Sequence, residues 1–124
     1  MKLILESQRA ELLANWRRGV ELAAADRDGE HDPRPVLKLF NPCGAQTWLL
    51  TEIVDHDEDD VILFGLCDLG HGTPELGYVS LAELASVRLF GGALGIERDI
   101  HFNAKKTISG YADEARRLGR IEVC

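Results

Sequence analysis

Hydrophobic and polar positions follow a pattern that predicts helices near both ends of the chain and strands between them. Residues 6–25 repeat apolar side chains every three or four positions, as an amphipathic helix does. These side chains are Leu13, Trp16, Val20 and Ala24. Ser7 stands where a helix N-cap is expected. Residues 107–119 show the same spacing and end at Gly119, which suits the position after a helix.

Between these helices, short β-branched and apolar segments predict strands separated by turns rich in glycine and proline. The predicted strands are residues 36–40, 46–53, 61–69, 75–80 and 96–102. Residues 61–69 are almost continuously apolar, which indicates a central strand covered on both faces. Ser80 and Glu83 form a capping-box pattern that predicts a short helix over residues 81–87.

The order of these elements predicts an α+β fold with a mostly antiparallel sheet of about five strands, packed by N- and C-terminal helices. Residues 1–124 contain no linker or repeat, so we expect a single globular domain with Trp16 and Trp48 in its core. Because the first residues resemble no signal peptide and no apolar run is long enough to cross a bilayer, we expect a cytoplasmic protein without a membrane partner.

Charge is distributed unevenly along the chain, whose net charge is −7. No Lys or Arg occurs from residue 39 to residue 87, and this segment holds nine carboxylates. Such a segment disfavours direct nucleic-acid binding, because phosphates are bound by basic residues. It favours a basic partner, a cation, or solubility alone. We expect its carboxylates to form one continuous patch on the folded protein.

Five of these carboxylates lie in one short loop, which we predict to be the partner-binding site. They are Asp55, Asp57, Glu58, Asp59 and Asp60. Their spacing resembles the start of a calcium-binding loop, but Asp60 stands where that loop needs glycine, and Leu66 where it needs glutamate. The sequence therefore favours a solvated acidic loop over a specific cation site.

A second candidate site lies in the segment CDLGHGTPELGYVS, residues 67–80. Its polar residues are Asp68, His71, Glu75 and Tyr78. Asp68 and Glu75 would form an acid–base pair if the turn between them brought them together. Zinc needs about four Cys or His ligands, and Cys67 is expected to be a buried, unreactive thiol. The chain has no phosphate-binding glycine motif, so we assign no metal, no cofactor and no catalytic residue.

The chain resembles the small bacterial proteins grouped as domain of unknown function 2958 in five segments: VLKLFNP, TWLLTEI, FGLCDLGHGTPELGYVSLAEL, IERDIHF and YADEARRLGRI. The likeness runs from the first helix to Ile121. It implies a protein of plasmids and conjugative elements, often encoded near antirestriction and transfer genes. It implies no activity and no catalytic residues. The segment HDEDD is longer and more acidic than the family pattern.

These observations lead to a hypothesis with two alternatives. We predict a non-enzymatic acidic binding protein, of antirestriction or anti-CRISPR type, whose carboxylates mimic nucleic-acid charge toward a basic host protein or nucleoprotein complex. The first alternative is a small enzyme or ligand-binding module built around residues 68–78. The second is an accessory protein whose charge only confers solubility. The sequence leaves the partner and the oligomeric state open.

Overall fold

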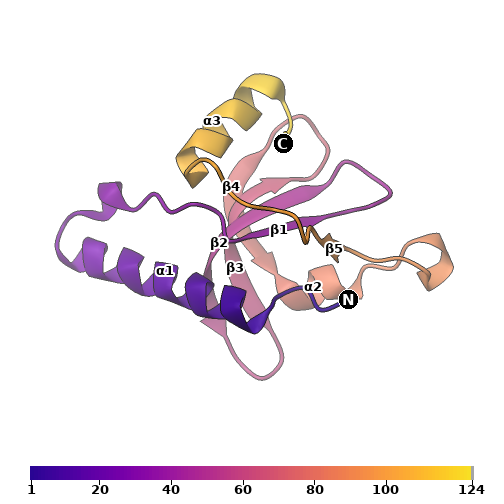
Figure 1. The fold of residues 1–124 in the computed structure, drawn as a ribbon, viewed down its shortest axis with the longest axis horizontal. Helices are drawn as coiled ribbons and strands as arrows, with labels where there is room; N and C mark the ends of the chain where they lie inside the picture. The colour runs from indigo at the N-terminus through magenta and orange to yellow at the C-terminus, as the bar shows by residue number, and fades with distance from the viewer. Residues whose placement is uncertain (124) are drawn as a thin grey trace.

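The computed structural model describes residues 1–123, which form a five-stranded antiparallel sheet with helices at both ends of the chain (Figure 1). The elements are α1 (Glu6–Ala24), η1 (Asp28–Glu30), β1 (Leu37–Phe40), β2 (Thr47–His56), β3 (Val61–Asp68), β4 (Glu75–Ser80), α2 (Leu81–Ser86), η2 (Phe90–Gly92), β5 (Glu97–Arg98) and α3 (Ile108–Leu118). The predicted α+β fold is confirmed.

The sheet has the strand order β4-β3-β2-β1-β5, so the first four strands form a meander and β5 pairs with the free edge of β1. Each face of the sheet has its own core. Leu50 packs with Leu12 of α1 and Leu84 of α2, whereas its neighbour Leu49 packs with Leu66 and α3. Successive residues of a strand point to opposite faces, which explains why β3 is apolar at nearly every position and why Trp48, Leu49 and Leu50 of β2 are all buried.

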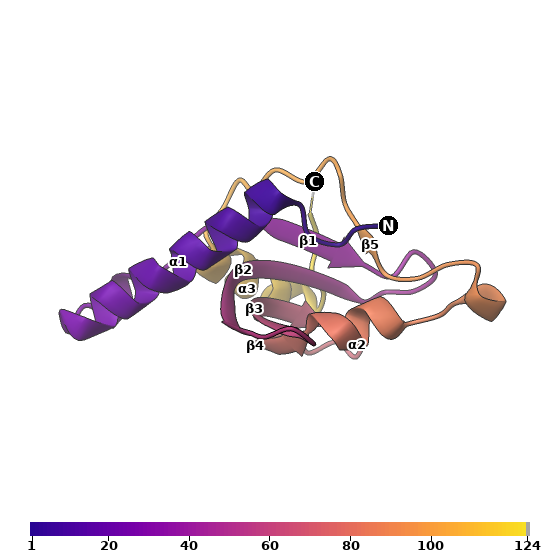
Figure 2. The same ribbon diagram turned by 90° about the horizontal axis from the view of Figure 1, so that it is seen from below.

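Helix α1 extends beyond the sheet, and this changes the predicted burial of its apolar stripe (Figure 2). Its fully covered positions are Leu12 and Leu22, whereas Trp16 keeps 39% and Val20 keeps 47% of its surface exposed. The prediction that Trp16 is a core residue is therefore wrong, while Trp48 is buried as predicted. The helix begins at Glu6, as predicted, but its cap differs from the prediction. Its N-cap is Leu5, whose backbone N–H donates to the side chain of Gln8, so Ser7 is not the cap.

Strand β2 is longer than predicted and continues to His56, so its hairpin with β3 projects from the rest of the sheet (Figure 1). Two irregularities in its pairing with β3, one of them at Thr51, accommodate the extra length. Bulges of this kind bend a strand and increase its twist. The hairpin loop is consequently confined to the residues around Glu58.

The predicted strand over residues 96–102 is mostly wrong. Only Glu97–Arg98 pair with β1, and Ile100 is 67% exposed. The cause is a local turn at Asp99, whose carboxylate accepts a hydrogen bond from the backbone N–H of His101 at 2.9 Å. Aspartate side chains commonly end extended segments in this way.

The two later helices begin and end close to their predicted limits. Ser80 caps α2 by accepting a hydrogen bond from the Glu83 N–H, and Gly119 ends α3 with φ = 75°.

Among the helices of residues 1–123, none combines the length and the apolar character that crossing a bilayer would require.

Candidate functional site

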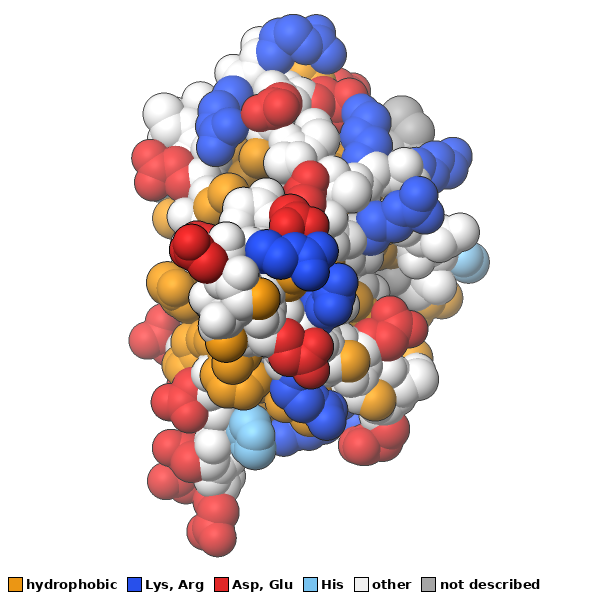
Figure 3. All heavy atoms as spheres, turned by 90° about the vertical axis from the view of Figure 1, so that its left-hand side faces the viewer, with side chains coloured by type: hydrophobic (Ala, Val, Ile, Leu, Met, Phe, Trp, Pro, Cys, Tyr) orange, Lys and Arg blue, Asp and Glu red, His pale blue; other side chains and the backbone are white. Residues whose placement is uncertain are grey.

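The acidic residues of the β2–β3 hairpin gather at its projecting end, which we call the acidic tip and define as residues 55–60. The side chains of Asp55, Asp57, Glu58 and Asp59 are exposed, and Asp60 is half-buried. Figure 3 shows carboxylate side chains along the projecting end of the molecule. In the described residues 1–123, the exposed carboxylates of the tip form no ion pair with a Lys or Arg side chain. Their charge therefore faces solvent.

Asp57 gives the acidic tip a fixed shape. Its carboxylate accepts hydrogen bonds from the N–H groups of Asp59 at 2.8 Å and Asp60 at 2.9 Å. Its own N–H donates to the carbonyl oxygen of Asp60. This is an Asx-type turn, in which an aspartate side chain replaces a backbone acceptor. Glu58 and Asp59 are consequently held at the outermost point of the hairpin.

Asp60 anchors the tip to α2 and differs in role from the other four. Its carboxylate accepts hydrogen bonds from the Ser80 hydroxyl at 2.5 Å and from the Ala82 N–H at 2.9 Å. The bond from Ser80, followed by that from Ala82, lowers the pKa of Asp60, so this carboxylate is ionised at neutral pH. Because both oxygens are used within the protein, Asp60 mainly positions the predicted site.

The expected continuous patch is wrong, because Glu52, Asp68 and Glu75 of the acidic segment are not directed toward the tip. Glu52 points at His31, with 2.7 Å between its Oε2 and the ring Nε2, and both side chains are largely buried. Asp68 lies at the opposite end of the eight-residue strand β3. Since strands rise about 3.3 Å per residue, roughly 25 Å separates it from the tip. The acidic surface is therefore restricted to the tip and its immediate surroundings.

The second candidate site is brought together only in part. His71, Glu75 and Tyr78 line a cavity of about 220 Å³ with Cys67, but Asp68 does not line it. Asp68 is 2% exposed, and its carboxylate accepts hydrogen bonds from the N–H groups of Gly70 and Ile121, both at 2.9 Å. It thus fastens the turn after β3 to the C-terminal segment.

The register of β4 directs the side chains of Glu75 and Tyr78, two other residues of the second candidate site, toward opposite faces of the sheet. Glu75 pairs with Cys67, and Tyr78 pairs with Phe64. Positions three apart on a strand point to opposite faces, so Glu75 and Tyr78 leave β4 in different directions. The Tyr78 ring packs against Phe64, with 5.2 Å between the ring centroids.

Among residues 1–123, no three His, Cys, Asp or Glu side chains are grouped as a metal site would require.

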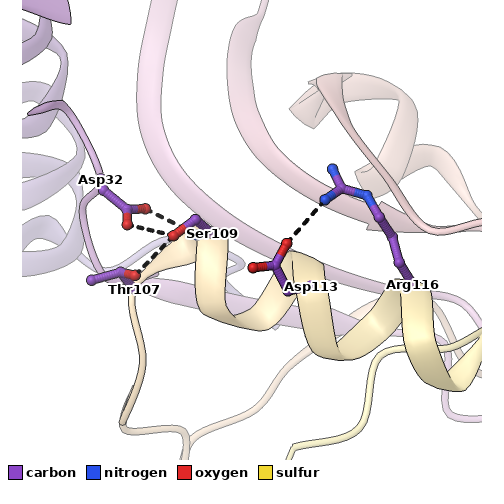
Figure 4. Close-up of polar contacts among 5 residues, drawn as sticks. All are labelled: Asp32, Thr107, Ser109, Asp113 and Arg116. Carbon is purple, nitrogen blue, oxygen red and sulfur yellow. Dashed lines mark hydrogen bonds and ion pairs between the residues drawn. The ribbon is translucent and has the colours of Figure 1, made fainter. Parts of the chain in front are cut away.

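A polar cluster that the sequence did not predict lies at the start of α3 (Figure 4). Asp32 accepts hydrogen bonds from both the N–H and the hydroxyl of Ser109, at 2.9 and 2.5 Å. Burial alone would raise the pKa of Asp32, but these bonds from Ser109 keep it below its usual value. Asp32 thus caps a helix from 77 residues away, a distance at which no local pattern signals the contact.

A family model described as "Protein of unknown function (DUF2958)" matches residues 3–122. The chain belongs to this family. The match spans the fold of the DUF2958 chain from before α1 to beyond α3 and confirms the predicted resemblance. No curated protein and no solved structure matches the chain. Residue roles in this DUF2958 protein therefore rest on the geometry described above.

The thiol of Cys67 in the DUF2958 chain is expected to be chemically inert. Burial raises the pKa of Cys67 to about 11, so at about pH 8 roughly one thiol in a thousand is ionised. Cys43 is exposed. We expect iodoacetamide to alkylate Cys43 at least about tenfold faster than Cys67, because the thiolate is the reactive form. Mass spectrometry of the peptides that contain each cysteine measures this ratio.

Unfolding provides the control for that experiment, since both cysteines should react at similar rates in concentrated urea. Equal rates in the folded DUF2958 protein would contradict the burial argument and would support a reactive site around Cys67.

Proposed function

We propose that this DUF2958 chain is a binding protein that presents its acidic tip to a basic site on a protein or nucleoprotein partner. The observation that supports this proposal most directly is the exposure of Glu58 and Asp59 on a projecting hairpin without a Lys or Arg partner in the described residues. Carboxylates that serve only the fold would instead be directed at backbone N–H groups, as those of Asp60 and Asp68 are. Asp55 is intermediate, because its exposed carboxylate accepts a hydrogen bond from the N–H of His56 at 2.9 Å.

The acidic tip has two properties that suit mimicry of nucleic-acid charge. Its negative groups are concentrated on consecutive residues, as phosphates are along a strand. Its shape is fixed by the turn at Asp57, so little conformational freedom is lost on binding. A basic groove that normally holds nucleic acid would attract such a tip electrostatically.

We propose that the protein counteracts a defence system of the host cell. The resemblance described above implies an origin on mobile genetic elements, and the partner would then be a host restriction or CRISPR complex in the cytoplasm. In this setting the protein acts by occupying a basic groove and carries out no chemistry of its own.

Neutralising the acidic tip is expected to slow association with the partner. The variant combines Asp55→Asn, Glu58→Gln and Asp59→Asn, and it retains Asp57 and Asp60 because they hold the turn. We expect the association rate constant at low ionic strength to fall by about tenfold and its dependence on salt to weaken. Capture from a host extract would identify the partner, and stopped-flow mixing with that partner over a range of salt would measure the rate.

A matched control carries Glu11→Gln, Asp26→Asn and Asp28→Asn. These three exposed carboxylates lie outside the tip, so the control has the same net charge as the tip variant. If both variants capture the same proteins with the same salt dependence as the unaltered chain, the acidic tip is not the binding site.

The cavity beside β4 supports a second candidate function, binding of a small polar ligand. His71 and Glu75 supply a hydrogen-bond donor and an acceptor at its wall. His71→Ala would then abolish the thermal stabilisation that a bound ligand gives. A metabolite screen that finds no stabilising compound would remove this candidate.

A further inference from the structure

A groove with both apolar and charged lining residues lies between α1 and the end of β2, next to the acidic tip. Its volume is about 410 Å³. It is lined by Leu13, Trp16 and Arg17 of α1 and by Ile53, Val54, Asp55 and His56 of β2. Asp55 belongs to both the groove and the tip, so the two surfaces are continuous. Figure 3 shows hydrophobic side chains gathered above the carboxylates of the projecting end.

The groove is open because α1 projects past the strands that cover its first half. Leu12 is completely buried, whereas Trp16, one turn later, is 39% exposed and Val20 is 47% exposed. Contiguous exposed apolar side chains mark interaction sites, whereas single ones do not, and tryptophan is enriched among residues that dominate binding energies at interfaces. The position of Trp16 beside a concave surface therefore indicates a contact with another molecule.

Charge distinguishes the two walls of the groove. The hairpin wall ends in Asp55 and continues into Asp57 and Glu58, whereas the helix wall carries Arg17. A bound segment would be favoured if its basic side chains faced the hairpin and its side toward Arg17 were neutral or acidic. The groove thus selects both the composition of a partner and its orientation.

We infer that this groove receives an apolar side chain from a basic amphipathic segment of the partner protein, whose Lys and Arg side chains contact the acidic tip. The inference rests on the proposed function and specifies its partner as a protein segment with an apolar anchor. Nucleic acid does not fit, because its phosphates would meet the carboxylates of the tip. A second copy of this chain fits poorly, because it also carries a net charge of −7 and would bring like charges together.

The test uses three fluorescein-labelled peptides as probes, with binding followed by fluorescence anisotropy. The first is an amphipathic helix of leucine and lysine. The second replaces leucine by serine, and the third replaces lysine by glutamate. We expect the first peptide to bind at least about tenfold more tightly than either of the others, because only it supplies both the anchor and the charge. Equal binding of the leucine and serine peptides, or no binding of the first, overturns the inference.

Variants of the full chain test whether the first peptide binds in the groove. Trp16→Ala should weaken binding of the first peptide by about tenfold, and Arg17→Glu should strengthen it several-fold by removing the positive wall. Tyr78→Ala is the matched control, since Tyr78 is a more exposed aromatic residue on the far edge of the sheet. If Trp16→Ala lowers the melting temperature, Arg17→Glu still provides the test, because its exposed side chain lies on the surface of α1.

The same measurements separate this inference from the proposed function. If Trp16→Ala and Arg17→Glu have no effect while the tip variant weakens binding of the lysine peptides, the groove inference fails and the tip proposal stands. If the groove variants act and the tip variant does not, the groove is a binding site but the acidic tip is not its charged partner.

Discussion

Replacing Gly65 by alanine is expected to destabilise the protein by more than about 3 kcal/mol, enough to leave much of it unfolded. A Cβ atom at this position would lie 2.0 Å from the carbonyl oxygen of Leu49 and 2.7 Å from the Cα of Leu50. Both atoms belong to the backbone of β2, so no side-chain rotation can relieve the overlap. Urea unfolding of the purified variant, or its loss to the insoluble fraction, measures the effect.

The close approach at Gly65 follows from the bulge in β2. Thr51 is skipped in the register, in which Leu50 faces Gly65 and Glu52 faces Phe64. Thr51 is held in place because its hydroxyl donates to the carbonyl oxygen of Phe64 and its own carbonyl accepts from Asn15. The first bond fixes β2 against β3 and the second fixes β2 against α1, so β2 cannot move away from Gly65 to admit a methyl group without losing them.

Gly77→Ala is the control for this prediction. Gly77 faces Gly65 on the neighbouring strand β4, yet a Cβ atom there would meet no atom within 4 Å. We expect a change of less than about 0.5 kcal/mol, because the added methyl group at half-buried Gly77 would enter open space. Similar stabilities of the two variants would show that β2 does not approach Gly65 as closely as described.

Asp68→Ala is expected to cost about 2 kcal/mol, the second-largest effect we predict. The buried carboxylate of Asp68 accepts from the N–H groups of Gly70 and Ile121, and alanine leaves both donors without an acceptor. Asp68→Asn should lose less, because its amide oxygen still accepts one of these bonds. Urea unfolding gives the free energies, and hydrogen exchange at Ile121 reports the release of the C-terminal segment.

The Asp68 variants also decide between a structural and a chemical role. Glu75→Gln, at an exposed site, should change stability by less than about 0.5 kcal/mol. Neither the Asp68 variants nor Glu75→Gln should affect binding at the acidic tip, since the whole length of β3 separates these residues from the tip. A stable Asp68→Ala variant would contradict the tethering role and would return Asp68 to the list of candidate acid–base residues.

Local patterns were sufficient to predict the elements of this fold, because hydrophobic period and turn residues act within a few positions. They were insufficient wherever a distant contact determines the outcome. The stripe containing Trp16 has the same spacing whether it is buried or open, and only the length of α1 relative to the sheet distinguishes the two. The alternation of residues 96–102 was overridden by the turn at Asp99.

For the candidate site, too, the sequence predicted the local grouping of residues but not their long-range contacts. The sequence placed five carboxylates in one loop, and the structure places them at one hairpin end. It did not reveal that Asp60 would be bound by Ser80, which is 20 residues further along the chain. The sequence also suggested that Asp68 and Glu75 form a pair, which the structure does not bring together. Closeness in the sequence does not show toward which face of a sheet each side chain points.

The turn at Asp57 divides the acidic tip into residues that hold its shape and residues that do not. Asp57 and Asp60 bind backbone N–H groups, while no hydrogen bond involves the side chains of Glu58 and Asp59 among residues 1–123. Mutation at these outermost positions can therefore proceed with little penalty to folding. A lineage whose binding target keeps changing would have, at this hairpin, two freely variable sites for adaptation.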